Sequence, residues 1–309
     1  MHQVGCIDVS RTINEKELMM NEKKNIEILC PTMHQNDFSK YYEMNIHGCD
    51  VLFTNQADQF SYQELIVGHN SLKMLTTATV GVGKNRNFAL ELSSGEILLF
   101  ADDDLIYEPD MSKIVRKAFE EFADADMIVF GTKYTADGKV YKYRKPKTGK
   151  LSFFKSLRYG TYAIAVRRKS VLMHNIHFSE LFGGGCIYSY GEDTDFIIQC
   201  FRKHLKIYAY GEVIASTSKN ASTCFSGYGE KFYFDRGALA KHSMGLMTIP
   251  YMIRMSLKDM NKEHVTRKDL NSNMSFRKKM RLLWSGYRCF PNLISYTKWA
   301  SENEKDHNC

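Results

Sequence analysis

Short apolar runs alternate with amphipathic segments along the first half of the chain. The segments Asn85–Leu92 and Met111–Phe122 carry apolar residues at helical spacing. Apolar runs that predict buried strands are Ile26–Cys30, Val51–Thr54, Leu72–Leu75, Glu96–Phe100 and Asp126–Phe130. Strands that are apolar throughout and separated by helices predict an α/β fold with a mostly parallel central sheet, covered on both faces.

The pattern changes after about Thr132. Lys139–Tyr143 and Thr161–Val166 predict strands with no long helix between them, and Glu192–His204 predicts a helix with one apolar face. Lys206–Ala215 predicts another strand, and the chain from Glu230 onward is helical in pattern and becomes basic. The second half of the chain therefore differs in organisation from the first, and it ends in a helical extension.

Composition is typical of a soluble globular protein. The 309 residues are 44% hydrophobic and 25% charged, and no apolar run is long enough to span a membrane. Residues 1–24 are polar, lack the apolar core of a signal peptide and are predicted to be disordered. None of the eight cysteines forms a C-x-x-C pair, and most lie in apolar runs. We therefore expect reduced thiols in a cytoplasmic protein rather than a disulfide framework or a zinc site.

The formal charge of +7 is concentrated near the C-terminus. Between Tyr251 and Phe290 ten Lys and Arg residues face three acidic ones, which gives +7 and leaves the rest of the chain neutral. Such a region favours an anionic neighbour, and Trp284 and Tyr287 among the basic residues are typical of a helix at a membrane surface. A solvated helix that packs on the body is the alternative. No RNA-binding signature is present, so no nucleic-acid partner is expected.

Three consecutive carboxylates, Asp102, Asp103 and Asp104, follow the predicted strand that ends at Phe100. Ligands of parallel sheets bind at the carboxyl ends of the strands. Mg²⁺ and Mn²⁺ take oxygen ligands, and they often use one or two carboxylates together with substrate phosphates. A bound cation would also relieve the repulsion among the three charges. The alternative is that these residues cap the next helix or face solvent.

A second acidic pair, Glu192 and Asp193, opens a predicted helix. The helix dipole keeps carboxylates ionised at this position, which suits a general base. Capping of the first turn is the alternative.

The segment GVGKNRNFALELSSGEILLFADDDLIYEPDM resembles the core signature of family 2 glycosyltransferases of the GT-A fold. The Glu192-Asp193 pair is similar to the E-D motif of that family, and Gly227–Gly237 is similar to the segment after the catalytic domain in many polysaccharide-building members. The similarity extends from about Ile26 to Gly237. The matching positions in the core signature are Gly81 or Gly83, Arg86-Asn87, Gly95, Asp103-Asp104 and Pro109.

The resemblance implies a role for each acidic residue. Asp104 matches the metal ligand, Asp103 the carboxylate near the ribose, and Asp102 is an additional ligand of the nucleotide or of metal-bound water. Asp193 is expected to be the catalytic base, and Glu192 to orient the acceptor. The positions expected to bind the nucleotide sugar are Pro31, Thr32, Asn55, Gln56, Arg86, Asp102 and Asp103.

The resemblance departs from the family at the first two strand ends. Family members often carry P-x-Y-N after the first strand and D-D-G-S after the second. This chain has Pro31-Thr32 after the first strand and Asn55-Gln56 after the second. An amide hydrogen bond from Asn55 or Gln56 is therefore expected to replace an aspartate in recognising the base.

The implied fold is the GT-A (Rossmann-like) nucleotide-diphospho-sugar transferase fold with a C-terminal helical extension. The implied parts are residues 1–24, disordered; 25–135, binding the nucleotide sugar; 136–236, binding the acceptor and supplying the base; and 237–309, the basic helical extension. The implied cofactor is Mn²⁺ or Mg²⁺.

The implied activity is inverting transfer of a hexosyl or N-acetylhexosaminyl group from a nucleotide diphosphate sugar, with a UDP-sugar expected. The acceptor would be a saccharide, lipid-linked in many such enzymes, in the synthesis of capsule, exopolysaccharide or O-antigen. The enzyme would be cytoplasmic, with membrane-surface contact through its basic C-terminal region.

Two other functions stay open at this point. A sugar nucleotidyltransferase would need a Gly-rich phosphate loop with Lys or Arg after the first strand, and CPTMHQND is not such a loop. A non-catalytic module that binds nucleotide or membrane would use the basic region alone.

Overall fold

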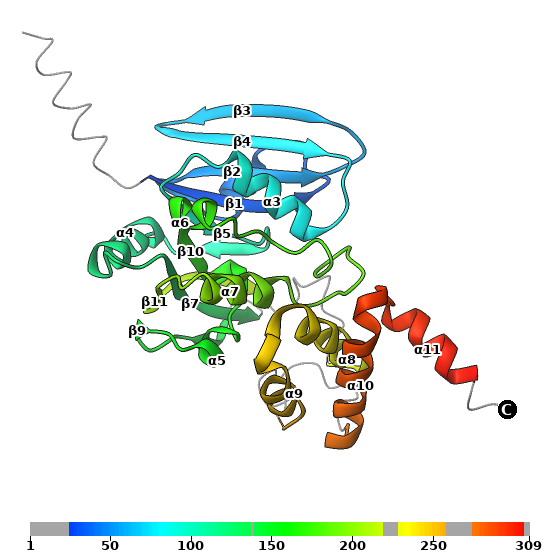
Figure 1. The fold of residues 1–309 in the computed structure, drawn as a ribbon. Helices are drawn as coiled ribbons and strands as arrows, with labels where there is room; N and C mark the ends of the chain where they lie inside the picture. The colour runs from blue at the N-terminus through cyan, green and yellow to red at the C-terminus, as the bar shows by residue number, and fades with distance from the viewer. Residues whose placement is uncertain (1–24, 137–138, 219–227, 258–273, 306–309) are drawn as a thin grey trace, which may run out of the picture.

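The computed structural model describes residues 25–136, 139–218, 228–257 and 274–305 (Figure 1). The predicted disordered segment 1–24 lies outside these residues. One mixed sheet forms the centre of the molecule, in the order β3-β4-β2-β1-β5-β10-β7-β11-β6, while β8 pairs with β7 and β9 with β11. The strands are β1 Ile26–Met33, β2 Asp50–Gln56, β3 Ser61–Val67, β4 Asn70–Thr77, β5 Ile97–Phe100, β6 Leu105–Tyr107, β7 Met127–Ala136, β8 Lys139–Arg144, β9 Gly149–Lys150, β10 Ile164–Arg167 and β11 Ile207–Ser218.

The strands β4, β2, β1 and β5 run parallel to one another, as the apolar runs predict. β10 lies antiparallel between β5 and β7, and β7 is parallel to β11. The parallel strands β1, β2, β4 and β5 therefore all end at one edge of the sheet, the carboxyl edge, and begin at the opposite, amino edge. This arrangement places the segments that follow β1, β2 and β5 beside one another.

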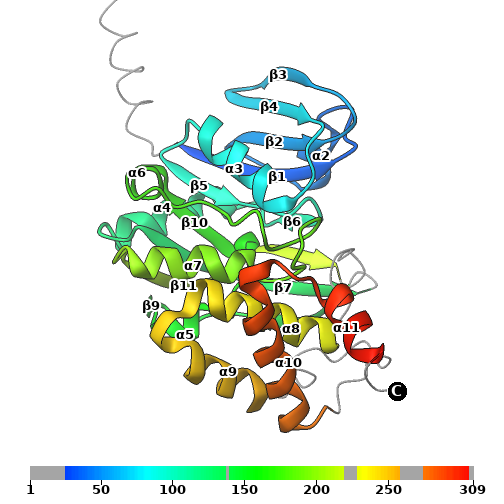
Figure 2. The same cartoon turned by 45° about the vertical axis from the view of Figure 1, so that its right-hand side comes forward.

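Helices cover both faces of the sheet, so the strands at its centre, such as β1, β2 and β5, are buried on both sides (Figures 1 and 2). One apolar cluster joins the sheet to α2 and α4, and the other joins it to α3, α6 and α7. In the second cluster Phe196 of α7 stacks on Phe178, with ring centroids 4.4 Å apart, and both rings pack edge-on against Phe100. The helices are α2 Ser39–Glu43, α3 Val82–Leu92, α4 Met111–Glu121, α5 Phe153–Ser156, α6 Arg168–Met173 and α7 Glu192–Arg202.

The sequence pattern predicts only one of the two strands in the hairpin of β3 and β4. β4 is longer than the predicted strand at Leu72–Leu75, and β3 was not predicted at all. All five central side chains of β3 are exposed, so the strand has no alternation of apolar and polar residues. Gly68, with φ +64°, makes the tight turn between the two strands.

The C-terminal extension is helical, as predicted, and it packs around an apolar cluster of its own. The backbones of α8 and α10 approach each other closely at two glycines, Gly237 of α8 and Gly286 of α10. A Cβ atom at Gly237 would collide with the carbonyl of Leu283, and one at Gly286 with the carbonyl of Phe234. The helices are α8 Glu230–Leu239, α9 Thr248–Leu257, α10 Phe276–Cys289 and α11 Tyr296–Lys305.

Candidate active site

The three aspartates lie at the carboxyl edge, immediately after β5. The backbone N–H of Ala101 still pairs with the carbonyl of Leu29 in β1, and the chain then turns, with the N–H of Leu105 donating to the carbonyl of Asp102. The turn leads into β6, which pairs with β11. The three carboxylates are therefore presented at the end of a buried strand, on a short turn that is fixed at both ends.

Arg86 of α3 connects this turn to the N-terminus of α7. Its side chain is only 5% exposed, and its Nη2 lies 2.7 Å from Oδ1 of Asp102. Its Nη1 lies 3.5 Å from Oε1 of Glu192 and 3.4 Å from Oδ1 of Asp193. The guanidinium also lies 5.3 Å from the centre of the Phe178 ring. The two acidic motifs, far apart in the sequence, thus meet on one buried cation.

Two carboxyl groups of this network, those of Asp102 and Glu192, have raised pKa values. Burial raises the pKa of Asp102 to about 6, against the opposing effect of Arg86 and together with repulsion from Asp193 and Asp104. Burial raises the pKa of Glu192 to about 7, with a further increase from Asp193 and a partial offset from Arg86. Carboxylic acids with such pKa values are suited to gain or lose a proton near neutral pH.

Asp103 and Asp104 follow Asp102 on the same turn, and both are half-buried. Burial raises the pKa of both, and repulsion from Asp103 adds to the increase at Asp104, while Lys40 of α2 lowers the pKa of Asp103. The hydroxyl of Thr217 in β11 donates to Oδ2 of Asp104 at 3.4 Å. Within the part of the chain that the structure describes, neither carboxylate forms an ion pair within 4.0 Å.

The second acidic pair is held by three groups besides Arg86. The hydroxyl of Thr161 donates to Oδ1 of Asp193 at 2.9 Å, and the N–H of Gly191 donates to Oε2 of Glu192 at 3.2 Å. Gly183, with φ +106°, packs so closely on Glu192 that a Cβ atom there would lie 2.9 Å from the carboxyl carbon. Glu192 is thereby covered, with 17% of its side chain exposed, whereas Asp193 keeps 30%.

Other residues of the core signature position this centre rather than line it. The side chain of Asn87 forms hydrogen bonds with both the N–H and the carbonyl of Phe178. These bonds attach the loop between α6 and α7 to α3. A Cβ atom at Gly83 would collide with the carbonyl of Ser179 in the same loop. The N–H of Gly95 donates to the carboxylate of Glu27 at 2.8 Å, and this contact fixes the entry to β5.

The residues predicted to recognise the base are occupied by contacts within the protein. Asn55 is fully buried, and its amide donates to the carbonyl of Gln35 at 2.9 Å and to the hydroxyl of Thr76 at 3.1 Å. Its oxygen accepts from the N–H of Gln35 at 2.9 Å and from the hydroxyl of Thr32 at 3.4 Å. Asn55 therefore holds the loop after β1 in place, and its amide has no hydrogen-bonding capacity left for a ligand.

The other residues predicted to bind the nucleotide near Asn55 are partly occupied or covered. Gln56 donates to the carbonyl of Thr79 at 2.9 Å, which leaves its side-chain oxygen for another partner. Thr32 is buried, and Pro31 is half-buried at the end of β1.

Part of this site lies in a segment that matches a known family. The family model for glycosyl transferase family 2 matches residues 61–181, a span that includes the core signature, Arg86 and the three aspartates. Residues 61–181 of the chain therefore resemble a family 2 glycosyltransferase domain. The resemblance and the enzyme class predicted from the sequence are thereby confirmed. No curated protein matches the chain in sequence.

Solved structures of S. aureus TarS share the fold of this glycosyltransferase. The structure of TarS 1–349 with UDP-GlcNAc superposes with a TM-score of 0.53 at 15% identity, over 88% of this chain and 74% of that one. The structure of TarS 1–349 with UDP gives 0.52 at 14% identity, over 86% and 72%. A further TarS structure gives 0.51 at 14% identity, and this chain spans 44% of it. The predicted fold class is thereby confirmed.

The structure brings most of the predicted site residues of the glycosyltransferase to one edge of the sheet. Asp102, Glu192 and Asp193 share the Arg86 guanidinium, and Asp103 and Asp104 lie on the same turn as Asp102. The sequence pattern did not predict Thr161 and Thr217, which donate hydrogen bonds to Asp193 and Asp104, or Lys40, whose charge lowers the pKa of Asp103. Their residue types carry no local signal, because only the fold brings them to the carboxylates.

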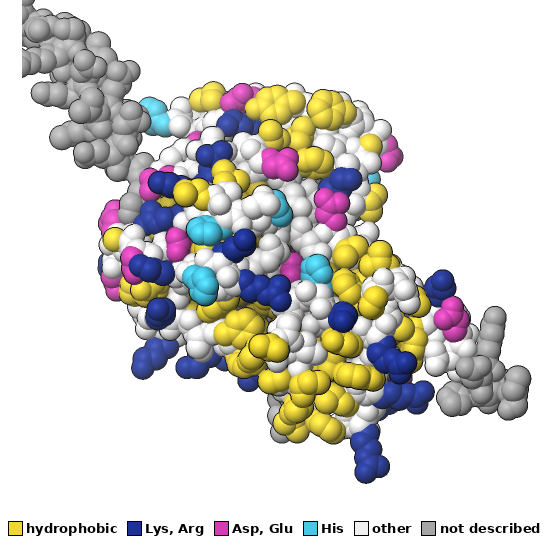
Figure 3. All heavy atoms as spheres, in the orientation of Figure 1, with side chains coloured by type: hydrophobic (Ala, Val, Ile, Leu, Met, Phe, Trp, Pro, Cys, Tyr) yellow, Lys and Arg dark blue, Asp and Glu magenta, His cyan; other side chains and the backbone are white. Residues whose placement is uncertain are grey.

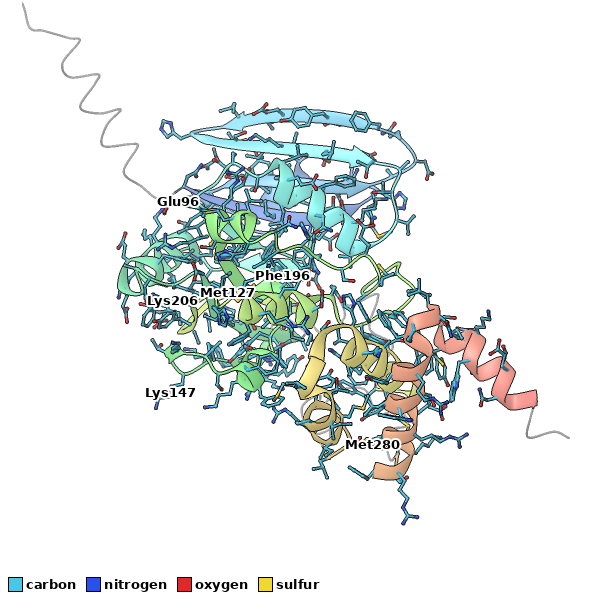
Figure 4. All side chains as sticks on the ribbon, in the orientation of Figure 1. Glu96, Met127, Lys147, Phe196, Lys206 and Met280 are labelled. Carbon is cyan, nitrogen blue, oxygen red and sulfur yellow. The ribbon has the colours of Figure 1, made fainter. Side chains whose placement is uncertain are left out.

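A cavity lies elsewhere, at the amino edge. It has a volume of about 900 Å³, and its lining includes Asp50, Glu96, Arg116, Arg167 and Arg168. Figure 4 shows Glu96 and Lys206 at this side of the molecule, away from the carboxyl edge. In the described part of the chain, no three His, Cys, Asp or Glu side chains are grouped closely enough to bind a metal by themselves.

Proposed function

We propose that this enzyme transfers a sugar from a UDP-sugar to a saccharide acceptor of a surface polysaccharide, with inversion at the anomeric carbon. The family match supports glycosyl transfer, and the similarity in fold to TarS, solved with UDP-GlcNAc and with UDP, supports a UDP-sugar. The proposed acceptor is a saccharide of capsule, exopolysaccharide or O-antigen, and the transferred group is a hexosyl or N-acetylhexosaminyl residue.

Asp104 would hold a divalent cation, Mn²⁺ or Mg²⁺, with Asp103 beside it near the ribose. The donor set fits, because both are hard oxygen ligands and both are partly buried; burial raises the pKa of both, and repulsion from Asp103 adds to the increase at Asp104. Two carboxylates suffice when the diphosphate of the substrate completes the coordination. Bound there, the cation would act as a Lewis acid on the charge of the leaving diphosphate.

Asp193 is the proposed base. The acceptor oxygen attacks the anomeric carbon, the bond from that carbon to the diphosphate breaks, and the acceptor proton passes to Asp193. Thr161 and Arg86 fix the carboxylate of Asp193, and its 30% exposure leaves it accessible to an incoming hydroxyl. Glu192, more covered and held by Gly191, is proposed to orient the acceptor. Displacement by a single attacking oxygen inverts the anomeric carbon.

Arg86 is proposed to position the carboxylates rather than to bind the nucleotide. Both of its terminal nitrogens point at carboxylates of this chain, and its side chain is 5% exposed. An approaching diphosphate would have to displace Asp102 to reach the guanidinium. The meeting of the two acidic motifs on Arg86 is the observation that carries the proposed function.

A thermal-shift series tests this function. The protein is measured with UDP, UDP-GlcNAc, UDP-glucose, GDP-mannose and ADP, each with and without Mn²⁺. We expect a rise in Tm with uridine nucleotides that depends on the cation, since ligands that bind only the native state stabilise it. No rise with any nucleotide would refute the proposal. Release of pyrophosphate from UTP and a sugar 1-phosphate would instead show a nucleotidyltransferase.

The proposed location is the cytoplasmic face of a membrane, where a lipid-linked acceptor is accessible. In the described residues, no helix is both long and apolar enough to cross a bilayer. Contact with the membrane is therefore proposed to be peripheral and to use the basic C-terminal extension.

A further inference from the structure

Helix α9 exposes a row of large aliphatic side chains. Leu246, just before the helix, is 101% exposed, and Ile249, Ile253 and Leu257 are exposed to 50%, 40% and 69%. Residues three or four apart lie on the same face of a helix, so these four side chains form one continuous row. We refer to these four residues as the α9 stripe.

The opposite face of α9 is apolar as well. Tyr251, Met252 and Met255 are buried in the cluster that joins α9 to Leu282 and Leu283 of α10. A helix that is apolar on all sides is normally covered on all sides. The α9 stripe is therefore the uncovered half of such a helix, and contiguous apolar surface of this kind marks a site of interaction.

Exposed basic side chains lie on α9 and on its neighbour α10. Arg254 is exposed on α9 itself, and its guanidinium lies 5.7 Å from the centre of the Phe154 ring. Arg277 and Arg281 are exposed on α10. Figure 3 shows hydrophobic side chains gathered over α9 and Lys or Arg side chains along α10. We refer to Arg254, Arg277 and Arg281 as the basic rim.

We propose that the α9 stripe and the basic rim dock the enzyme on an anionic lipid surface. Aliphatic side chains would enter the boundary between headgroups and acyl chains, and the arginines would contact lipid phosphates. A second copy of the chain is a poorer occupant, because residues 251–257 and 274–290 carry six Lys and Arg residues and no Asp or Glu, and two such surfaces would repel each other. This surface lies on α9 and α10, outside the catalytic centre, and its occupancy does not depend on which sugar is transferred.

Sedimentation with vesicles tests this surface. The wild type is mixed with vesicles of phosphatidylcholine alone or of phosphatidylcholine with phosphatidylglycerol. The stripe variant carries Ile249→Ser, Ile253→Ser and Leu257→Ser. A matched control carries Tyr62→Ser and Ile66→Ser in β3, where the side chains are 53% and 63% exposed. The Tm of each variant is measured alongside, because all of these side chains are exposed and the fold should persist.

We expect the wild type and the β3 control to sediment with the anionic vesicles and much less with the neutral ones. The stripe variant should bind the anionic vesicles at least about tenfold more weakly, since each inserted methylene contributes about 0.8 kcal/mol. A rim variant with Arg277→Gln and Arg281→Gln should bind more weakly than the wild type, and its binding should depend less on salt.

Three results would overturn the proposal. The first is a wild type that does not sediment with anionic vesicles, and the second is a folded stripe variant that sediments as the wild type does. The third is a wild-type dimer in light scattering that becomes monomeric in the stripe variant without any binding to vesicles, which would show that a second copy covers α9. None of these measurements needs donor or acceptor, so failure here is distinct from failure of the proposed glycosyl transfer.

Discussion

The two edges of the central sheet differ in how their charges are satisfied. At the amino edge, Arg167 pairs with Glu96 at 3.2 Å and donates to the carbonyls of Ala125 and Ala123 at 2.8 and 3.0 Å. At the carboxyl edge, Asp102, Glu192 and Asp193 share the single guanidinium of Arg86. The amino edge has a cavity of about 900 Å³, and the carboxyl edge has the perturbed pKa values. Unbalanced charge, rather than volume, locates the candidate active site in this molecule.

Replacing the proposed base should have the largest effect. Asp193→Asn should lower the rate of transfer by about a thousandfold, because a positioned base contributes about 10² to 10⁴. The matched change at the amino edge, Glu96→Gln, removes a carboxylate that is paired but lies far from the site, and it should leave the rate unchanged. A rate for Asp193→Asn within tenfold of the wild type would show that another group accepts the proton.

Removing the Arg86 guanidinium, which Asp102, Glu192 and Asp193 share, should destabilise the protein strongly. Arg86→Met leaves three carboxylates without their counter-charge and should cost about 2 to 4 kcal/mol in urea unfolding at pH 8, a value reduced from that of fully buried pairs because Asp102 is partly exposed. Adding Asp102→Asn should restore part of that loss. Arg168→Met at the amino edge, which removes one hydrogen bond to Ser93, should cost about 1 kcal/mol. Equal losses at the two edges would contradict the contrast between them.

The raised pKa of Glu192 predicts a dependence of stability on pH. Its pKa is about 7 in the folded protein against an ordinary 4.5, so ionisation of Glu192 opposes folding. This destabilisation is absent below about pH 4.5, where the carboxyl is protonated in both states, and it is complete above about pH 7. Glu192→Gln should therefore raise the free energy of unfolding at pH 8 and have little effect at pH 4. The opposite sign at pH 8 would mean that Arg86 outweighs burial.

The smallest effect on activity is expected from replacing Thr161, the uncharged residue that donates a hydrogen bond to Asp193. Thr161→Val removes the hydroxyl that donates to Asp193 and should reduce kcat about fivefold with little change in KM, since such a bond contributes about 1 kcal/mol. Thr161→Ser keeps the hydroxyl and should restore kcat. If both variants lose activity alike, packing rather than the hydrogen bond is responsible.

The sequence predicted those parts of the fold and site that leave a local pattern. Buried strands such as β1 and β5 are apolar runs, and the turn after β5 and the start of α7 carry adjacent carboxylates. The strand β3 was missed because its central side chains face solvent, and its position is set mainly by backbone pairing with β4. The pattern identified Arg86 but assigned it to the nucleotide, since only the fold shows that it reaches Glu192.

Asn55 shows the same limit at a polar position. An amide at the end of β2 suggested recognition of the base, yet its four hydrogen bonds go to Thr32, Gln35 and Thr76. Residues that contact each other across the sheet are set by strand order, which no local pattern encodes. The role of each site residue therefore stays a prediction that rests on geometry.

The central claim is that the two acidic motifs form one centre with divided roles, one for the donor and one for the acceptor. Calorimetric titration of UDP in the presence of Mn²⁺, together with turnover of UDP-GlcNAc, tests it directly on the wild type, Asp104→Asn and Asp193→Asn. We predict that Asp104→Asn loses UDP affinity, whereas Asp193→Asn binds UDP as the wild type does and yet transfers sugar about a thousandfold more slowly. Unchanged UDP affinity in Asp104→Asn, or full turnover in Asp193→Asn, would contradict the account.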